Sequence, residues 1–249
     1  MPTFECLKEI AFRQPCSIPF ENLDVLAGRR IEVDSESIRN KLVGRARGGY
    51  CFECNGLLLD ALLAIGFEAT PLSARVRVLV PPGTVAPLTH MTIKVVQGER
   101  TWLVDSGFGG FSPTAPIDLE SDQAQETPHN CYRLHRDGTT TVLQIWSEGE
   151  WMDGYALSGI EMTYSDRVVG NWYTSTHPNS HFRMRPFCSK ANEDGSRVNV
   201  LGDKFTWRRG HEVLETRTIE TRDTLKELLR ERFSLELDEA VPFLVVAPC

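Results

Sequence analysis

The sequence lacks any long apolar run, and no stretch approaches the roughly 18 residues that a membrane-spanning helix needs. Its start also lacks the apolar segment of a secretory signal, because Glu5, Lys8 and Glu9 are charged. These absences argue against a membrane partner and against export. We therefore expect a cytoplasmic protein.

Blocks of basic residues are missing as well. The formal net charge is -7, and the densest basic runs are only Arg45 to Arg47 and Arg208-Arg209. An acidic chain without a basic block is a poor partner for nucleic acid or for an anionic membrane. Internal repeats and low-complexity runs are absent too. We expect a globular protein that binds a small molecule or another protein, with no nucleic acid, and leave the oligomeric state open.

Paired cysteines are scarce, although the chain contains seven cysteines. Their odd number and irregular spacing favour reduced thiols over a disulfide framework. Cys51 and Cys54 form one C-x-x-C, which leaves a redox pair or half of a zinc site as alternatives. Neither Cys131 nor Cys188 belongs to a second close pair, so we expect no metal.

What the sequence does contain is a cysteine at the predicted start of a buried helix. Cys51 follows Gly48-Gly49 and precedes the apolar run Leu57 to Ile65, which ends at Gly66. Unpaired N–H groups and the positive end of the helix dipole favour the nucleophilic thiolate there. A buried structural cysteine explains the same stretch equally well, so partners elsewhere must decide.

Two charged residues flank this cysteine. Glu53 lies two positions after Cys51 and on a helix points away from the sulfur, so it need not be an acid or a base. Arg47 precedes the glycines. We predict that Arg47 and Glu53 form a buried or half-buried ion pair that fixes the loop.

The pattern of apolar and polar residues changes twice along the chain, which predicts three structural parts. Residues 1–66 read as helical, with helices over Thr3 to Arg13, Ser35 to Val43 and Cys51 to Ile65. Residues 67–158 read as evenly spaced antiparallel strands with turn residues between them. This second pattern is typical of a β-barrel or a strongly curved sheet.

The third part, residues 159–249, mixes strands with one helix. Its first segment, Met162 to Gly170, has no pattern that assigns its state. Long loops often carry function, which draws attention to Pro81 to Pro87 and Phe111 to Asn130. The predicted strands are Phe182 to Phe187, Phe205 to Arg208 and Glu212 to Ile219, and the predicted amphipathic helix is Thr221 to Phe233.

A histidine and an aspartate come from neighbouring predicted strands. His90 begins the strand His90 to Val96, and Asp105 follows the strand Thr101 to Val104. In an antiparallel pair the start of one strand lies beside the end of the next, so these two side chains are predicted to be close. Taken alone, Asp105 could also be an aspartate that caps a turn, and His90 could also be an ordinary surface histidine. Together with Cys51 they supply the nucleophile, base and orienting acid of cysteine catalysis.

These residues resemble the arylamine N-acetyltransferase family. Its nucleophile motif R-G-G-x-C-x-E-x-N matches Arg47 to Asn55 in full. Further segments resemble the family in the same order, and the likeness runs from Phe4 to about Phe187. They are Ile18 to Asp24, the His90 strand, Val104 to Gly109 and Ser175 to Phe182.

The resemblance implies an α+β fold of helical bundle, antiparallel β-barrel and C-terminal α/β lid around a cysteine-protease-like catalytic core. It implies a triad of Cys51, His90 and Asp105 and a ping-pong reaction through an acetyl-cysteine. Acetyl-CoA would be the co-substrate, and arylamines, arylhydroxylamines or hydrazines the acceptors. By analogy the cleft that holds donor or acceptor is lined by Thr89, Gly107, Phe108, Gly109, His181 and Phe182.

The sequence departs from the family in two places. Family members usually begin with roughly one more helix before the segment equivalent to Phe4, which predicts a shortened start and a less stable bundle. Cys54 occupies the variable position of the motif, where oxidation is expected to join it to Cys51. A papain- or transglutaminase-like enzyme that cleaves or exchanges amides remains an alternative, because the same triad order serves it.

Overall fold

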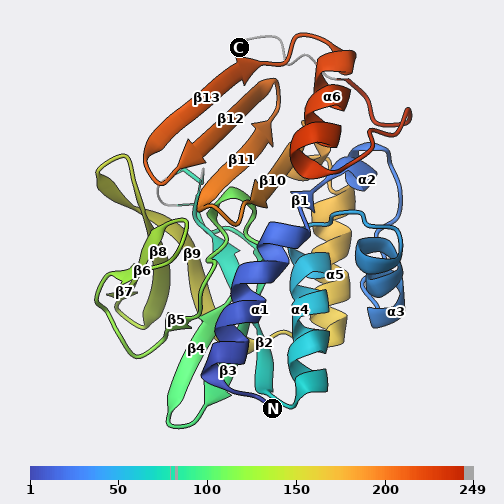
Figure 1. The fold of residues 1–249 in the computed structure, drawn as a ribbon. Coiled ribbons are helices and arrows are strands. Elements are labelled where there is room, and N and C mark those ends of the chain that lie inside the picture. The colour runs from blue at the N-terminus through green and yellow to red at the C-terminus, as the bar shows by residue number, and fades with distance from the viewer. Residues whose placement is uncertain (79, 82–83, 244–249) are drawn as a thin grey trace.

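The N-terminal part of the computed structural model is a set of helices packed on the strands that follow (Figure 1). The structure describes residues 1–78, 80–81 and 84–243. The Pro81 to Pro87 loop, one of the two long loops picked out from the sequence, therefore lies partly outside the described residues. The helices are α1 (Phe4–Ser17), α2 (Leu23–Leu26), α3 (Ser35–Arg39), a π-helical turn (Asn40–Gly44) and α4 (Cys51–Ile65).

Local sequence explains where these helices begin and end. The side chain of Thr3 caps α1 by accepting a hydrogen bond from the backbone N–H of Cys6. The Asp34 carboxylate caps α3 in the same way through the N–H of Ser37. Helix α4 ends at Gly66, whose φ of 100° is a conformation that glycine adopts at little cost.

An eight-stranded antiparallel sheet follows and curls into a nearly closed barrel. The strand order is β5-β4-β3-β2-β9-β8-β7-β6. The side chain of Gln125 on β6 joins the two ends of this order, because it bonds the backbone N–H and C=O of Asp118 on β5 at 2.7 and 3.0 Å. The strands are β2 (Glu68–Val76), β3 (Leu88–Gln97), β4 (Arg100–Val104), β5 (Ile117–Asp118), β6 (Gln125–Glu126), β7 (Cys131–Asp137), β8 (Thr140–Ser147) and β9 (Glu150–Glu161).

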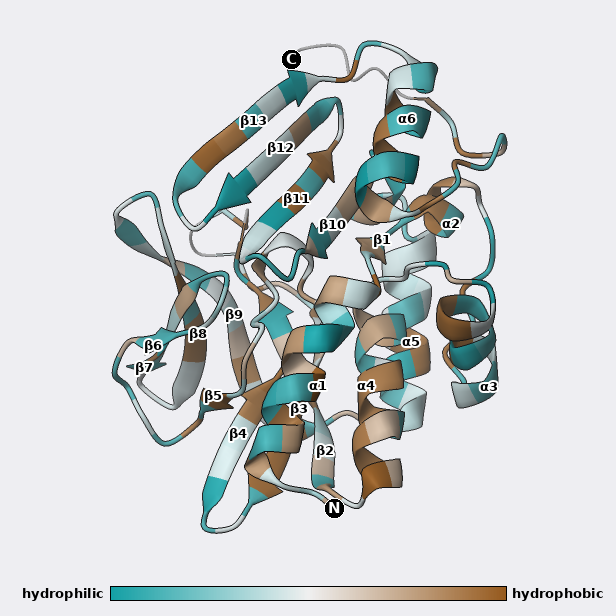
Figure 2. Ribbon diagram, viewed as in Figure 1, coloured by the Kyte–Doolittle hydropathy of each residue, from teal (hydrophilic) through white to brown (hydrophobic). Residues whose placement is uncertain are grey.

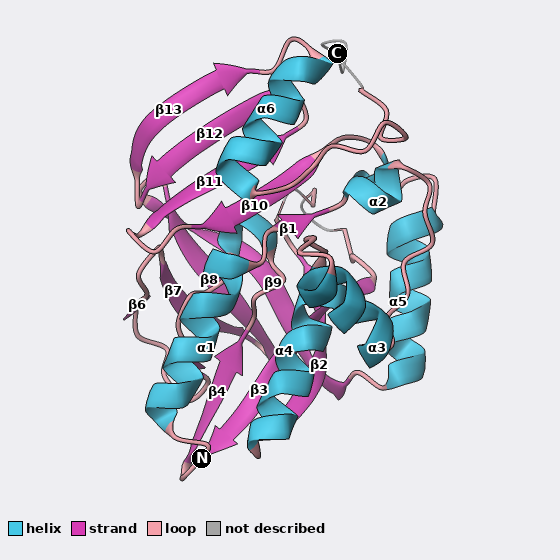
Figure 3. Cartoon of the chain, turned by 45° about the vertical axis from the view of Figure 1, so that its right-hand side comes forward, coloured by secondary structure: helices cyan, strands magenta, loops and turns pink. Residues whose placement is uncertain are grey.

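The last part adds helix α5 and a second sheet covered by helix α6. The sheet has the order β1-β10-β11-β12-β13, so its edge strand β1 (Phe20–Glu21) comes from the N-terminal part. Figure 3 shows α6 lying across one face of this sheet. The remaining elements are α5 (Tyr164–Thr176), β10 (Phe187–Ala191), β11 (Ser196–Leu201), β12 (Lys204–Arg209), β13 (Glu212–Thr218) and α6 (Arg222–Phe233).

The strand predicted at Phe182 to Phe187 is wrong. His181–Arg183 forms a short 3-10 helix, and β10 begins only at Phe187. The phenylalanines in this segment anchor a turn: Phe182 and Phe187 stack with ring centroids 6.1 Å apart. The unassigned segment Met162 to Gly170 belongs to α5, whose capping box pairs Thr163 with Asp166.

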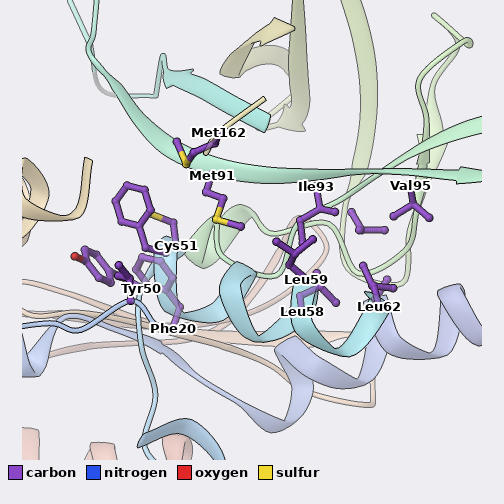
Figure 4. Close-up of a cluster of buried hydrophobic side chains, with 14 of the residues drawn as sticks. Phe20, Tyr50, Cys51, Leu58, Leu59, Leu62, Met91, Ile93, Val95 and Met162 are labelled. Carbon is purple, nitrogen blue, oxygen red and sulfur yellow. The ribbon is translucent and has the colours of Figure 1, made fainter. Parts of the chain in front are cut away.

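Two of the apolar cores join elements from different parts of the chain. The larger one packs α1 and α4 against β3, and Figure 4 shows Cys51 at its edge among Tyr50, Met91 and Met162. Helix α4 is apolar along most of its length, whereas α6 turns a hydrophilic side outward (Figure 2). The second core lies between α6 and the second sheet and includes Leu225, Leu229 and Phe205. No helix in the described ranges is both long and apolar enough to span a bilayer.

Candidate active site

Cys51 is the first residue of α4, as predicted. Tyr50 is the N-cap, and its backbone N–H donates to the Glu53 carboxylate at 3.1 Å, which fixes the first turn of the helix. Cys51 is only 4% exposed, and its Sγ lies 3.7 Å from the carbonyl oxygen of Thr89. The helix start therefore carries the thiol to the beginning of β3.

His90 and Asp105 meet where the register of two strands brings them together. Strands β3 and β4 pair antiparallel with Ile93 opposite Val104, so the start of β3 lies beside the residue after β4. His90 Nε2 and Asp105 Oδ2 are 2.6 Å apart, and both side chains are buried. The predicted proximity of these two residues is confirmed. Because Nε2 faces the carboxylate, Nδ1 is the nitrogen available to exchange a proton with a thiol.

The Asp105 carboxylate accepts two further hydrogen bonds, both from neutral groups. Its Oδ1 receives the side-chain amide of Asn55 at 2.8 Å and the backbone N–H of Gly107 at 2.9 Å. Asn55 lies four residues after Cys51 and so projects from the same side of α4. Its role went unrecognised in the sequence, although this i,i+4 spacing within the motif was a usable signal.

Aromatic rings fix the orientation of His90. The imidazole centroid lies 5.0 Å from the ring of Phe108 and 4.8 Å from that of Tyr155 on β9. The two aromatic rings in turn meet edge to face at 4.8 Å. Tyr155 is fully buried, and nothing in the sequence distinguished it from an ordinary core residue.

Burial and the helix start shift the pKa of the Cys51 thiol in opposite directions. Burial raises the pKa of the Cys51 thiol, and the nearby Asp105 carboxylate raises it further. Backbone N–H groups of Met91 and Phe52 act in the opposite direction and are outweighed. The N–H groups at the helix start therefore favour the thiolate, as predicted, but burial and Asp105 have the larger, opposite effect on the pKa. A thiol held in this way ionises when a neighbouring base accepts its proton.

Cys51 and His90 open into a cavity of about 470 Å³ between the barrel and the second sheet. Thr89, Gly107, Phe108, His181 and Phe182, all predicted cleft residues, line it.

Gly109, also a predicted cleft residue, does not appear among the described residues that line the cavity. It has a φ of +59°, and a Cβ placed on it would lie 2.8 Å from Cζ of Phe187. Gly109 therefore forms a packed corner, and Gly110 takes its place at the wall.

The turn after Asp105 is pressed tightly against α4 and held by the second sheet. A Cβ on Gly107 would lie 2.8 Å from the Cα of Cys51 and 2.7 Å from Nδ2 of Asn55, so only glycine fits. On the other side, the buried Arg197 guanidinium donates to the carbonyls of Gly109 and Ser112 at 3.1 and 2.9 Å. Nothing in the sequence pattern marks Arg197 for this role.

The ion pair predicted between Arg47 and Glu53 is wrong. Glu53 pairs with Lys41 at 2.7 Å, whereas Arg47 pairs with Glu21 at 3.1 Å and Asp24 at 3.5 Å. Asp24 also bonds Lys41 at 2.8 Å and so links the Glu53–Lys41 pair to the contacts of Arg47. Glu53 lies on the side of α4 that faces the π-helical turn, while Arg47 faces β1. We call Glu21, Asp24, Lys41, Arg47 and Glu53 the ion cluster.

Cys54 faces away from the cavity. Its thiol donates to the carbonyl of Gly49 at 3.2 Å, and it packs in a small cluster with Ile38 and Leu42. Cys51 belongs to a different cluster, so the two sulfurs of the C-x-x-C point to different sides. Within the described ranges, no group of three or more His, Cys, Asp or Glu residues is arranged to hold a metal ion.

The chain matches known sequences over almost its whole length. A family model described as N-acetyltransferase matches residues 3–241. The arylamine N-acetyltransferase / N-hydroxyarylamine O-acetyltransferase of Salmonella typhimurium is 38% identical over 240 residues, covering 96% of this chain and 85% of that protein. The arylamine N-acetyltransferase of Mycolicibacterium smegmatis is 36% identical over 242 residues, covering 96% and 87%.

Solved structures show the same fold. The arylamine N-acetyltransferase of Salmonella typhimurium superposes with a TM-score of 0.89 at 37% identity, covering 94% of this chain and 85% of that one. The Mycobacterium marinum arylamine N-acetyltransferase in complex with CoA gives a TM-score of 0.89 at 35% identity, covering 94% and 87%. The predicted α+β class, with helices, antiparallel barrel and second sheet, is confirmed.

Proposed function

Because the chain belongs to the arylamine N-acetyltransferase family and is an acyltransferase, we propose that it moves the acetyl group of acetyl-CoA through Cys51 to an aromatic amine. Arylhydroxylamines and hydrazines are the other acceptors in this proposal. The observation that carries it is one cavity into which both Cys51 and His90 open, with His90 held 2.6 Å from a buried Asp105. This arrangement supplies a nucleophile, a base and an orienting carboxylate.

In the first half-reaction His90 acts as the general base. Its Nδ1 takes the proton of the Cys51 thiol while Sγ attacks the thioester carbonyl of acetyl-CoA. Burial raises the pKa of the Cys51 thiol, so a base that accepts its proton favours the nucleophilic thiolate. Asp105 stabilises the imidazolium that forms, and backbone N–H groups near Cys51 stabilise the oxyanion. When the C–S bond to CoA breaks, the imidazolium returns its proton to the CoA sulfur, leaving acetyl-Cys51.

The second half-reaction runs the same groups in the opposite direction. The amine nitrogen attacks the acetyl-cysteine carbonyl, and His90 Nδ1 accepts the proton that the nitrogen loses. The C–S bond to Cys51 then breaks, and the imidazolium returns the proton to the cysteine sulfur. The products are the acetylated amine and the free thiol, so each turnover restores the starting enzyme.

The walls of the cavity suit both substrates. Phe108, Phe182 and Phe187 lie close to the catalytic end and offer flat apolar faces to an aromatic acceptor. Lys204 and Arg208 line the part formed by β12 and suit the phosphates of the acyl donor. This local positive charge contrasts with the net charge of -7 for the whole chain. We assign the phenylalanines to the acceptor and the basic residues to CoA.

We also place the enzyme in the cytoplasm. The six cysteines in the described part of the chain are all free thiols, which suits a reducing compartment. Family membership argues against both alternatives, the amide-cleaving cysteine enzyme and the C-x-x-C redox or zinc module. The opposite orientation of the Cys51 and Cys54 side chains argues against the second as well.

Steady-state kinetics test the proposal. Acetyl-CoA and an arylamine, varied together, are expected to give parallel double-reciprocal lines, because each acetyl group passes through the enzyme before the amine reacts. Intersecting lines would point to direct transfer in a ternary complex. Arylamine acetylation no faster than in buffer would overturn the assignment.

A further inference from the structure

We propose that Gln14 on α1 is a positioning residue for the triad, acting through Ser106 and Asn55. This inference rests on the proposed function, since it assumes that Cys51, His90 and Asp105 do the chemistry. Gln14 is three residues before the end of α1. Its Nε2 donates to Ser106 Oγ at 2.8 Å and to the carbonyl of Cys54 at 2.7 Å. One side chain thus joins α1, α4 and the turn after Asp105.

The hydroxyl of Ser106 passes this contact on to Asn55. With Gln14 donating to it, Ser106 Oγ directs its own hydrogen at Asn55 Oδ1, 3.4 Å away. The backbone N–H of Ser106 donates to the same oxygen at 2.9 Å. Asn55 Oδ1 therefore faces two donors from one residue, and Ser106 is 5% exposed, so water cannot easily replace them.

The orientation of the Asn55 amide matters for Asp105. Nδ2 donates to Asp105 Oδ1 at 2.8 Å and to the carbonyl of Met91 at 2.6 Å. A reversed amide would turn its oxygen toward the carboxylate and toward that carbonyl, which is repulsive. The donors at Ser106 select the productive orientation. Gln14 strengthens this selection, because it fixes the direction of the Ser106 hydroxyl.

Hydrogen bonds are donated in one direction from Gln14 as far as Asp105, where they meet the bond that His90 donates from the other side. Gln14 donates to Ser106, Ser106 to Asn55, Asn55 to Asp105, and Asp105 accepts from His90 Nε2 on its other oxygen. Each donor polarises the next, which holds the carboxylate in place against the imidazole. Loss of the first donor is expected to loosen the carboxylate and weaken its stabilisation of the imidazolium.

The test compares Gln14→Met with Gln97→Met. Gln97 is the matched control: it is also partly buried, and its Nε2 ties the residues before α1 to β3 through the carbonyl of Pro2 at 3.1 Å, far from the triad. Methionine keeps the volume and removes the donor. Iodoacetamide alkylation of Cys51, followed on its peptide by mass spectrometry from pH 5 to 10, reports thiol activation without acetyl-CoA.

We expect Gln14→Met to alkylate about tenfold more slowly at neutral pH, the order of loss that one positioning hydrogen bond carries. The pH midpoint of alkylation should rise, because a poorly held Asp105 favours the imidazolium less. The kcat for acetyl transfer should fall with it, while KM for the arylamine and the melting temperature stay close to the parent values. Gln97→Met should match the parent in every respect.

A double-variant cycle with Ser106→Ala tests the route. If Gln14 acts through Ser106, the double variant is no slower than the slower single variant. If the rate losses of the two single variants multiply in the double variant, Gln14 does not act through Ser106. An unshifted pH midpoint, or equal losses in Gln14→Met and Gln97→Met, would reduce Gln14 to a structural contact. A parent protein that alkylates rapidly but acetylates no amine would contradict the proposed function and leave the positioning role standing.

Discussion

Two buried polar networks diverge from the start of α4, and they are built from different groups. On one side Glu53 enters the ion cluster, where cations and carboxylates pair directly at 2.7 to 3.5 Å. On the other side Asn55 reaches Asp105, whose carboxylate is surrounded by an amide, a backbone N–H and an imidazole. One turn of helix therefore connects a structural network with a chemical one.

The difference lies in how each network compensates its charge. In the ion cluster burial opposes the charge of Lys41, yet Glu53, Glu21 and Asp24 outweigh it and raise the pKa of Lys41. Each charge there is committed to a partner. Asp105 has neutral donors instead, so its negative charge remains available to the imidazolium that forms during proton transfer. Removing a residue of the ion cluster should therefore lower stability, whereas removing a residue of the network around Asp105 should lower activity.

The largest expected effect comes from Cys51→Ala. Removing the nucleophile should abolish acetyl transfer, and folding should change little because alanine only shortens the side chain at the edge of the core. Turnover with an arylamine and a thermal melt check the two halves of this statement. Near-normal turnover would refute the role of Cys51.

The next largest effect is expected for Asp105→Asn. An amide cannot stabilise the imidazolium and can hold His90 in the wrong tautomer, so kcat/KM should fall by about 10³ to 10⁴. His90→Ala should lose a similar factor and slow the alkylation of Cys51. Alkylation as fast in His90→Ala as in the parent would show that the imidazole does not activate the thiol.

Lys41→Met tests the other network. It leaves Asp24 and Glu53 without their shared cation, which should lower the free energy of unfolding by about 3 to 5 kcal/mol. Urea denaturation measures this loss. The kcat per folded molecule should stay within a few-fold of the parent value. A loss of activity as large as that of Asp105→Asn would show that the ion cluster also supports catalysis.

The smallest effect is a pH dependence within the ion cluster. Burial by itself would raise the pKa of Asp24, but Lys41, Arg47 and Arg29 overcome it and lower the pKa to about 2 from 3.8. A depressed carboxyl pKa stabilises the folded state above the unfolded value, and this contribution disappears as pH falls from about 4 to about 2.

The lowering of the Asp24 pKa in the folded state corresponds to about 2 kcal/mol of folding stability. Urea titrations at successive pH values should show a steeper acid loss for the parent than for Asp24→Asn. Equal acid slopes would mean that Asp24 gains nothing from its cations.

The sequence predicted all three residues of the proposed triad but not the residues that support them. Cys51 could be placed from the apolar run that follows it, and His90 and Asp105 from the geometry of one hairpin. Asn55, Ser106 and Tyr155 were missed, because a buried hydrogen bond depends on side chains from elements far apart in sequence. Gln14 and Ser106, for example, lie 92 residues apart.

The ion cluster was mispredicted for a related reason. Arg47 and Glu53 are near in sequence, but the helix start turns them to different sides, and Lys41, Asp24 and Glu21 are better placed to pair with them. Strand β10 was misplaced because the phenylalanines before it pack a turn. Local sequence pattern thus predicted most helices and strands, but it failed where the partner of a side chain depends on tertiary contacts.

The most direct test of the central claim is mass spectrometry of the protein after brief exposure to acetyl-CoA without an acceptor. We predict the mass of one acetyl group, located on the Cys51 peptide, and its removal on adding an arylamine with the acetylated amine appearing in equal amount. An acetylated amine that forms while Cys51 stays unmodified would contradict the account, as would an acetyl group on another residue.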